Sequence, residues 1–132
     1  MKWDAYNERC PTRMVLDRIA DKWTVLIVGA LEEKTKRFGE LRREVGGVSQ
    51  KMLTQTLRGL ERDGVVVRTV YASVPPKVEY SLTRLGRTLV HILEEIRKWS
   101  ELNIEDVLKA RDDFDSRSQS EGPITPSIVL TS

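Results

Sequence analysis

Six polar side chains in the middle of the sequence have types and spacing that suit nucleic-acid recognition. Between residues 49 and 60, Leu53, Leu57 and Leu60 recur at the spacing of one buried helical face. The other face carries hydroxyl, amide and cationic groups, and no acidic residue interrupts it. Such groups bind phosphates and base edges in a DNA major groove. The candidate contacts are Ser49, Gln50, Lys51, Thr54, Gln55 and Arg58.

The residues around this set predict how it is positioned. A helix over about 39–45, the glycine pair Gly46-Gly47 and a second helix over 49–63 form a helix-turn-helix. Ser49 is placed to cap the second helix. Gly64 ends it, with Val65 placed to contact Leu60 as in a Schellman motif. The second helix would therefore be the recognition helix.

A β-hairpin is predicted directly after this motif. The run VVVRTVY is rich in β-branched residues, and VEYSL alternates apolar and polar side chains. Pro75-Pro76 supplies no backbone donors, so it belongs in the tip between the two strands. A helix pair followed by a hairpin, here 65–82, is a winged helix-turn-helix. We expect an α+β fold, mainly α.

Further basic residues flank the recognition helix. From 36 to 68 there are eight basic and four acidic residues, as expected for a segment that meets phosphate. Arg37, Arg42 and Arg43 are predicted to clamp phosphates, and Arg68 and Lys77 on the wing to touch phosphate or the minor groove.

Two outer helices complete the predicted domain, which spans 1–112. The first helix is expected over about 11–20 and the last over about 83–112. A helix of nearly 30 residues, about 40 Å long, exceeds the needs of so small a core. A second copy of the chain is the simplest partner for its apolar stripe, giving a homodimer. Packing on the first helix of the same chain is the alternative.

Composition excludes several classes of protein. The 132 residues contain no apolar run of about 20 residues and no signal sequence at the start, so we expect a cytoplasmic protein without a membrane segment. The single cysteine excludes an internal disulfide and a cysteine-rich zinc site. Ser, Pro, Gly and acidic residues dominate 113–132, which predicts a disordered acidic and polar tail.

No motif in the sequence indicates an enzyme. The only histidine, His91, has no ligand set beside it on the last helix. The glycines form no GxGxxG after a strand, and no catalytic triad or carboxylate pair is evident. We therefore predict no catalytic residue, no cofactor and no metal.

The sequence resembles the HxlR family of bacterial transcription regulators, which are winged-helix proteins related to the MarR group. The stretches that carry the resemblance cover about 10–99: CPTRMVLDRIADKWTVLIVGAL, RFGELRREVGGVSQKMLTQTLRGLERDGVVVRTVY and VPPKVEYSLTRLGRTL. The resemblance implies a homodimer that binds a pseudo-palindromic operator, with the dimer interface on the first and last helices. We expect a repressor.

Cys10 is the candidate sensor. Some members of the resembled family sense oxidants, electrophiles or aldehydes through a cysteine just before the first helix, and Cys10 occupies that position. A helix N-terminus and the nearby Arg9 and Arg13 favour a thiolate, which is the reactive form of cysteine. The alternative is a buried, unreactive thiol.

Two other functions remain open on the sequence. Apolar surface between the core and the last helix could hold a small-molecule effector, with Cys10 structural. A winged helix can also serve as a protein-interaction module without an operator, although an apolar patch would be expected on the 49–58 face in that case.

Overall fold

The computed structural model describes residues 2–121, which divide into a first unit up to residue 97 and a second from residue 98. No helix in this range is long and apolar enough to span a membrane. The elements are α1 (Thr12–Ile19), α2 (Lys22–Glu33), α3 (Phe38–Glu44), α4 (Gln50–Arg62), β1 (Val66–Tyr71), β2 (Lys77–Leu82) and α5 (Arg84–Glu121). The predicted winged helix-turn-helix is confirmed.

The turn between α3 and α4 forms as the sequence predicts. Gly47 adopts a φ of +84°, where a side chain would be strained. Ser49 is the N-cap of α4, and its Oγ accepts a hydrogen bond of 3.0 Å from the backbone N–H of Met52. This bond satisfies one of the backbone donors left unpaired at the start of a helix.

The other end of α4 is closed by a Schellman motif. Gly64 has a φ of +77°, and the N–H of Val65 donates to the carbonyl of Leu60 at 2.9 Å. The N–H of Gly64 donates to the carbonyl of Glu61 at 3.1 Å. Both bonds of the motif are therefore present, and both ends of α4 are fixed by local sequence.

The core of the first unit lies between α2, α3, α4, the base of the hairpin and the start of α5. Fully or almost fully buried side chains come from each of these elements: Ile27, Val28, Leu31, Leu41, Leu53, Leu57, Leu60, Val66, Leu82 and Leu93. Burying one such side chain contributes roughly 1.5–3 kcal/mol. By contrast, α1 contributes no buried residue; only Ile19, partly buried, packs against this core.

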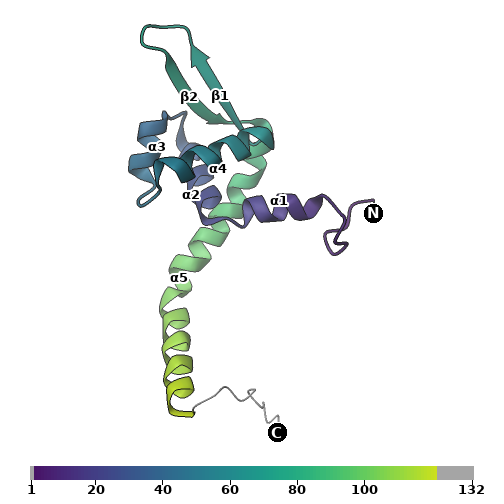
Figure 1. The fold of residues 1–132 in the computed structure, drawn as a ribbon, viewed down its shortest axis with the longest axis vertical. Coiled ribbons are helices and arrows are strands. Elements are labelled where there is room, and N and C mark those ends of the chain that lie inside the picture. The colour runs from purple at the N-terminus through teal and green to yellow at the C-terminus, as the bar shows by residue number, and fades with distance from the viewer. Residues whose placement is uncertain (1, 122–132) are drawn as a thin grey trace. The chain divides into compact units, whose positions relative to one another are not determined.

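The hairpin is antiparallel, and its register runs from the pair Val66 with Leu82 to the pair Tyr71 with Lys77. It projects from the helices of the first unit in Figure 1. The backbone of Lys36 exchanges hydrogen bonds of 3.0 and 2.8 Å with Tyr80, so the segment before α3 adds a short bridge to β2. This bridge ties the wing to the helix-turn-helix.

One threonine joins the two ends of the hairpin. Thr83 Oγ donates to the carbonyl of Gly64, and Thr83 N–H donates to the carbonyl of Val65 at 3.0 Å. The same Oγ accepts from the N–H of Gly86 at 3.0 Å. A Cβ on Gly86 would lie 2.2 Å from the Val65 carbonyl oxygen, so only glycine fits this approach.

The predicted end of the last helix is wrong. It was expected near 112, but α5 continues to Glu121, so residues 113–121 of the predicted disordered tail are helical. Residues 122–132, the rest of that tail, lie outside the described residues. In the second unit, the residues after 97 are helical as far as Glu121 and expose large apolar side chains: Trp99, Leu102, Ile104, Leu108 and Phe114.

Candidate nucleic-acid interface

The outer face of α4 is polar and free of core packing. All six predicted contacts on this helix are exposed, whereas Leu53, Thr56 and Leu57 are buried on the other side. The exposed set is Ser49, Gln50, Lys51, Thr54, Gln55 and Arg58. Since the buried face fixes the rotation of the helix, these six side chains are held on one outward surface.

A groove of about 370 Å³ lies between α4 and the hairpin. Its lining brings together three predicted contacts from different elements, namely Thr54 and Arg58 of α4 and Arg68 of β1. Leu57, Glu61 and Tyr80 complete the lining. Two guanidinium groups and two hydroxyl groups in one groove can hold a phosphate of a DNA backbone.

The two basic residues of the wing lie on opposite faces of the hairpin. Arg68 pairs with Tyr80, and Lys77 pairs with Tyr71. Because side chains alternate along a strand, these two pairs point to opposite sides. Arg68 therefore belongs to the groove beside α4, and Lys77 does not. The structure does not bring the two wing residues together.

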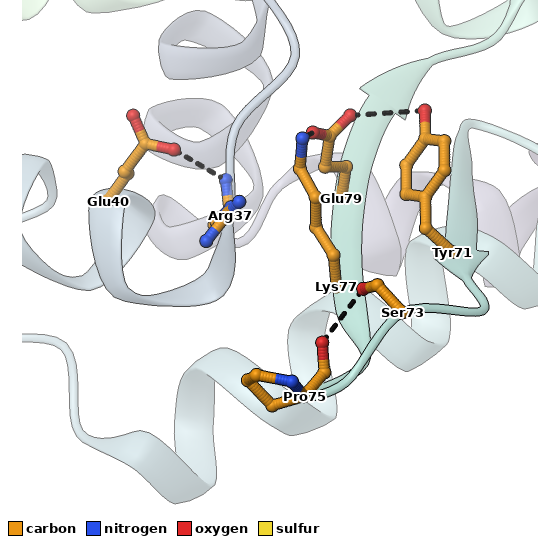
Figure 2. A network of polar contacts seen from close by, with 7 residues as sticks. All are labelled: Arg37, Glu40, Tyr71, Ser73, Pro75, Lys77 and Glu79. Carbon is orange, nitrogen blue, oxygen red and sulfur yellow. Dashed lines mark hydrogen bonds and ion pairs between the residues drawn. The ribbon is translucent and has the colours of Figure 1, made fainter.

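Lys77 belongs instead to a polar cluster on the other face of the hairpin. Figure 2 shows both oxygens of Glu79 engaged, one by Lys77 Nζ at 2.9 Å and the other by the Tyr71 hydroxyl at 3.4 Å. The ammonium group also lies 5.3 Å from the Tyr71 ring centre. The Lys77 hydrogen bond is the main cause that lowers the pKa of Glu79, and the charge of Arg37 adds to it. Glu79 thus holds Lys77, one of the predicted phosphate contacts, beside Tyr71.

The three arginines of the α3 region are exposed and lie apart from the groove. The N–H of Arg37 donates to Glu40 at 3.0 Å, and this bond is the main cause that lowers the pKa of Glu40. Arg42 and Arg43 occupy the last turn of α3, with exposed side chains. Beside Arg43, the buried Lys36 forms an ion pair with Glu44. Arg42 and Arg43 are therefore exposed cations on a surface that also carries Glu40 and Glu44.

Cys10 is half-buried directly before α1, which begins at Thr12. Its Sγ accepts hydrogen bonds from Thr12 Oγ at 3.1 Å and from the N–H of Asp4 at 3.4 Å. The Thr12 hydroxyl is the largest cause that lowers the pKa of Cys10 below the ordinary 9.0. These donors stabilise the thiolate form.

The donors to the thiol differ from those expected. Arg13 was expected to favour the thiolate, but its guanidinium donates to the carbonyls of Ala5 and Tyr6, at 2.9 and 3.1 Å. Arg13 therefore fixes the backbone of the segment that precedes Cys10. Sequence reasoning missed Thr12, two positions after the cysteine, although a hydroxyl at a helix start is a recognisable donor.

Sequence reasoning also missed Tyr80 and Glu79. Both lie in the alternating strand VEYSL, and period-two alternation places Tyr80 on the same face as the buried Leu82. Within residues 2–121, no three His, Cys, Asp or Glu side chains gather as a metal site. His91 is exposed.

Three comparisons with known proteins bear on this interface. A model of the HxlR-like helix-turn-helix family matches residues 18–107. An uncharacterised HTH-type transcriptional regulator of Escherichia coli K12, YtfH, is 49% identical over 108 residues, covering 82% of this chain and 86% of the relative.

Two solved structures extend the similarity. The structure of the transcriptional regulator YtfH from Salmonella typhimurium superimposes with a TM-score of 0.77 at 46% identity, covering 83% of this chain and 98% of the other. The redox regulator HypR in its oxidised form has a TM-score of 0.66 at 48% identity, covering 71% and 97%. The relatives are regulators of transcription.

Proposed function

The chain belongs to the HxlR-like helix-turn-helix family of transcription regulators, and from that premise we propose that it is a homodimeric repressor of a pseudo-palindromic operator. One observation carries the proposal: α4 holds a wholly polar and exposed face beside a groove that Arg58 and Arg68 line together. In this geometry α4 enters the major groove of DNA, and its first turns contact the bases.

The remaining basic residues take the phosphates on either side. Arg58 and Arg68 hold one backbone position through the groove beside α4. Arg37, with Arg42 and Arg43 of α3, and Lys77 on the outer face of the wing, meet neighbouring phosphates. Such contacts make binding fall steeply with salt.

Apolar surface that its own chain leaves uncovered supports the homodimer. In α1, the side chains of Met14, Val15 and Leu16 are 68%, 55% and 48% exposed. In the first unit, α5 also exposes Ile92 and Ile96. Large exposed apolar side chains on a helix that buries no residue are typical of an interaction site. A second copy covers it in the proposal, and the twofold axis then sets two α4 helices about one DNA turn apart, roughly 34–36 Å.

Cys10 is the proposed sensor of oxidants or electrophiles. Its lowered pKa and half-exposed position give the thiolate that such chemistry needs. The thiolate sulfur attacks a peroxide oxygen, the O–O bond breaks, and the leaving oxygen takes a proton. The sulfenic acid then condenses with a thiol of another molecule and releases water. With one cysteine per chain, any disulfide joins Cys10 to a small thiol or to a second copy.

A second candidate signal is a small molecule in a hollow of about 680 Å³ between α2, the end of α3 and α5. Val25, Leu26 and Ala30 give it apolar walls, and Glu32 and Glu33 lie in its lining. Glu44 and Glu94 also line it, the first in an ion pair with Lys36 and the second with Arg97. Its chemistry suits an organic cation with an apolar body, because opposite charge and apolar contact both favour such a ligand.

A gel-shift titration with DNA from the upstream region of the gene tests the proposal. We expect specific, salt-dependent binding by a dimer, lost on treatment with peroxide and retained by Cys10→Ser. Arg58→Ala should lower affinity by about 1–3 kcal/mol. Weak, sequence-blind binding would refute the operator. An oxidant response that persists in Cys10→Ser would refute the sensor and favour the hollow beside α2.

A further inference from the structure

We propose that Arg18 is a positioning residue for DNA binding, which holds the C-terminal half of the recognition helix α4 against α1 and transmits the state of α1 to it. The proposal rests on the proposed function, since it concerns the regulation of that same DNA-binding surface. It assigns a role to Arg18, Gly59 and Asp63, none of which faces the groove beside α4.

The contact joins segments far apart in the sequence. Arg18 lies in the last turn of α1, and its Nε donates to Asp63 Oδ2 at 3.0 Å, across 45 positions. Asp63 is the C-cap of α4, and its own N–H donates to the carbonyl of Gly59 at 3.0 Å. The Arg18 guanidinium thus forms an ion pair with the residue at which α4 ends.

Gly59 gives the guanidinium its place on α4. A Cβ built on Gly59 would lie 2.3 Å from Arg18 Nη1 and 2.4 Å from Cζ. No real Cβ contact is so short, so Arg18 lies directly on the bare backbone of α4. A mid-helix glycine destabilises a helix relative to alanine, and a side chain here would have to displace the flexible end of Arg18.

Apart from Arg18, the packing of α1 in the unit is mainly against α2. No residue of α1 is buried, and only Ile19, partly buried, packs against the core. The neighbouring residues Cys10 and Thr12 form the thiol site at the other end of the same helix. A displacement of α1, by modification of Cys10 or by a change in the partner copy, is therefore delivered to α4 through Arg18.

The change in DNA affinity on removing the charge of Asp63 distinguishes a positioning role from a purely electrostatic role. Removing the negative charge of Asp63 near a DNA-binding surface should strengthen binding if charge alone matters. If Arg18 and Asp63 position α4, Asp63→Asn weakens binding instead. Gly59→Ala changes no charge and raises helix propensity, yet it displaces the guanidinium and should also weaken binding.

The experiment is a double-mutant cycle on the full chain, with operator affinity and thermal midpoint measured for each variant. We expect Arg18→Gln, Asp63→Asn and Gly59→Ala each to weaken operator binding about 3- to 10-fold. Arg18→Gln combined with Asp63→Asn should be no weaker than the weaker single variant, since both remove one contact. Asp17→Asn on α1, which removes one negative charge away from this contact, is the matched control for Asp63→Asn.

Each outcome decides the matter. Tighter binding by Asp63→Asn, additive single effects, or unchanged binding by Gly59→Ala overturns the role of Arg18. Gly59→Ala keeps the test decisive if Arg18→Gln unfolds, because a thermal midpoint that holds or rises excludes misfolding.

A parallel titration with peroxide links the contact to sensing. The fold-loss of affinity on oxidation should shrink at least by half in Arg18→Gln relative to the unmodified chain. If oxidant does not change operator binding by the unmodified chain, the sensor proposed at Cys10 is refuted. The double-mutant cycle then still tests the role of Arg18. If it binds no operator, the proposed function itself has failed.

Discussion

The helices α4 and α1 lie in the same unit and differ in almost every source of stability. Three leucines of α4 are at most 1% exposed, its first turn is capped by Ser49, and a Schellman motif closes its end. In α1 no residue is buried, and its N-cap, Pro11, makes no side-chain bond. The predicted DNA-contact face therefore lies on a well-packed and capped helix, and the thiol adjoins a helix that buries no residue.

This difference is what a regulator of the proposed kind requires. Elements with few buried contacts open or shift at low free-energy cost, whereas core helices keep their geometry. In the proposed mechanism, a modification at Cys10 moves α1 without unfolding α4, so the proposed DNA-contact face changes position and keeps its internal arrangement.

The largest expected effect concerns the core side of α4. Leu57→Ala should lower the free energy of unfolding by about 2–5 kcal/mol, because it leaves a cavity around a side chain that is 1% exposed. Urea denaturation followed by circular dichroism measures it. The exposed Gln55→Ala is the control, with an expected change within about 0.5 kcal/mol. If Leu57→Ala lowers the free energy of unfolding by less than about 1 kcal/mol, α4 is not stabilised by its buried face as described.

Leucine truncation in α1 should act on assembly instead. Leu16 is 48% exposed in one chain, so Leu16→Ala should hardly change the stability of a monomer. If a second copy covers it, the dimer dissociation constant should rise roughly 10-fold, as expected for one apolar side chain partly buried. Sedimentation at several concentrations reports this. An unchanged dimer constant would place the interface elsewhere.

The two helix starts should respond differently to alanine. Ser49→Ala removes the bond to Met52 and should cost about 0.5–2 kcal/mol of unfolding free energy. Pro11→Ala removes no side-chain bond, so its cost should be much smaller. Thermal unfolding of both variants compares them directly. Equal losses would contradict the contrast between the two caps.

The smallest expected effect is on the thiol. Thr12→Val removes the hydroxyl donor and keeps a similar shape, so the pKa of Cys10 should rise toward 9.0. The alkylation rate of Cys10 by iodoacetamide should then reach its half-maximum at a higher pH than in the unmodified chain. Thr35→Val, exposed and distant in sequence, is the control. Identical pH profiles would show that Thr12 does not support the thiolate.

Local signals account for the parts of the fold that sequence predicted. Ser49 and Gly64 mark the ends of α4 through bonds within a few residues, and the leucine spacing selects its buried face. The continuation of α5 past 112 also had a local signal, which was overlooked: no glycine or proline lies between Gly86 and residue 121. The polar composition of 113–121 suggested disorder, but it also permits an exposed helix.

The arrangement of the candidate site depended on contacts that sequence does not encode locally. The faces of Arg68 and Lys77 follow from the hairpin register, and a slip of one strand by one residue would place both side chains on the same face. A tip containing Pro75-Pro76 leaves that register open. The contact between Arg18 and Asp63 spans 45 positions and follows only from how α1 packs. The predicted contacts on α4 and the wing remain predictions until DNA binding is measured.

The closure of the hairpin by Thr83 also bears on how such proteins diversify. Thr83 and Gly86 contact Gly64 and Val65, so the two ends of the hairpin are held together at its base. The tip of the hairpin takes no part in these contacts. Residues can be inserted, deleted or exchanged around 72–76 without altering where α4 ends or α5 begins. Grafting the tip of a relative between these anchors should transfer operator preference in the flanking base pairs and leave preference at the centre of each half-site unchanged.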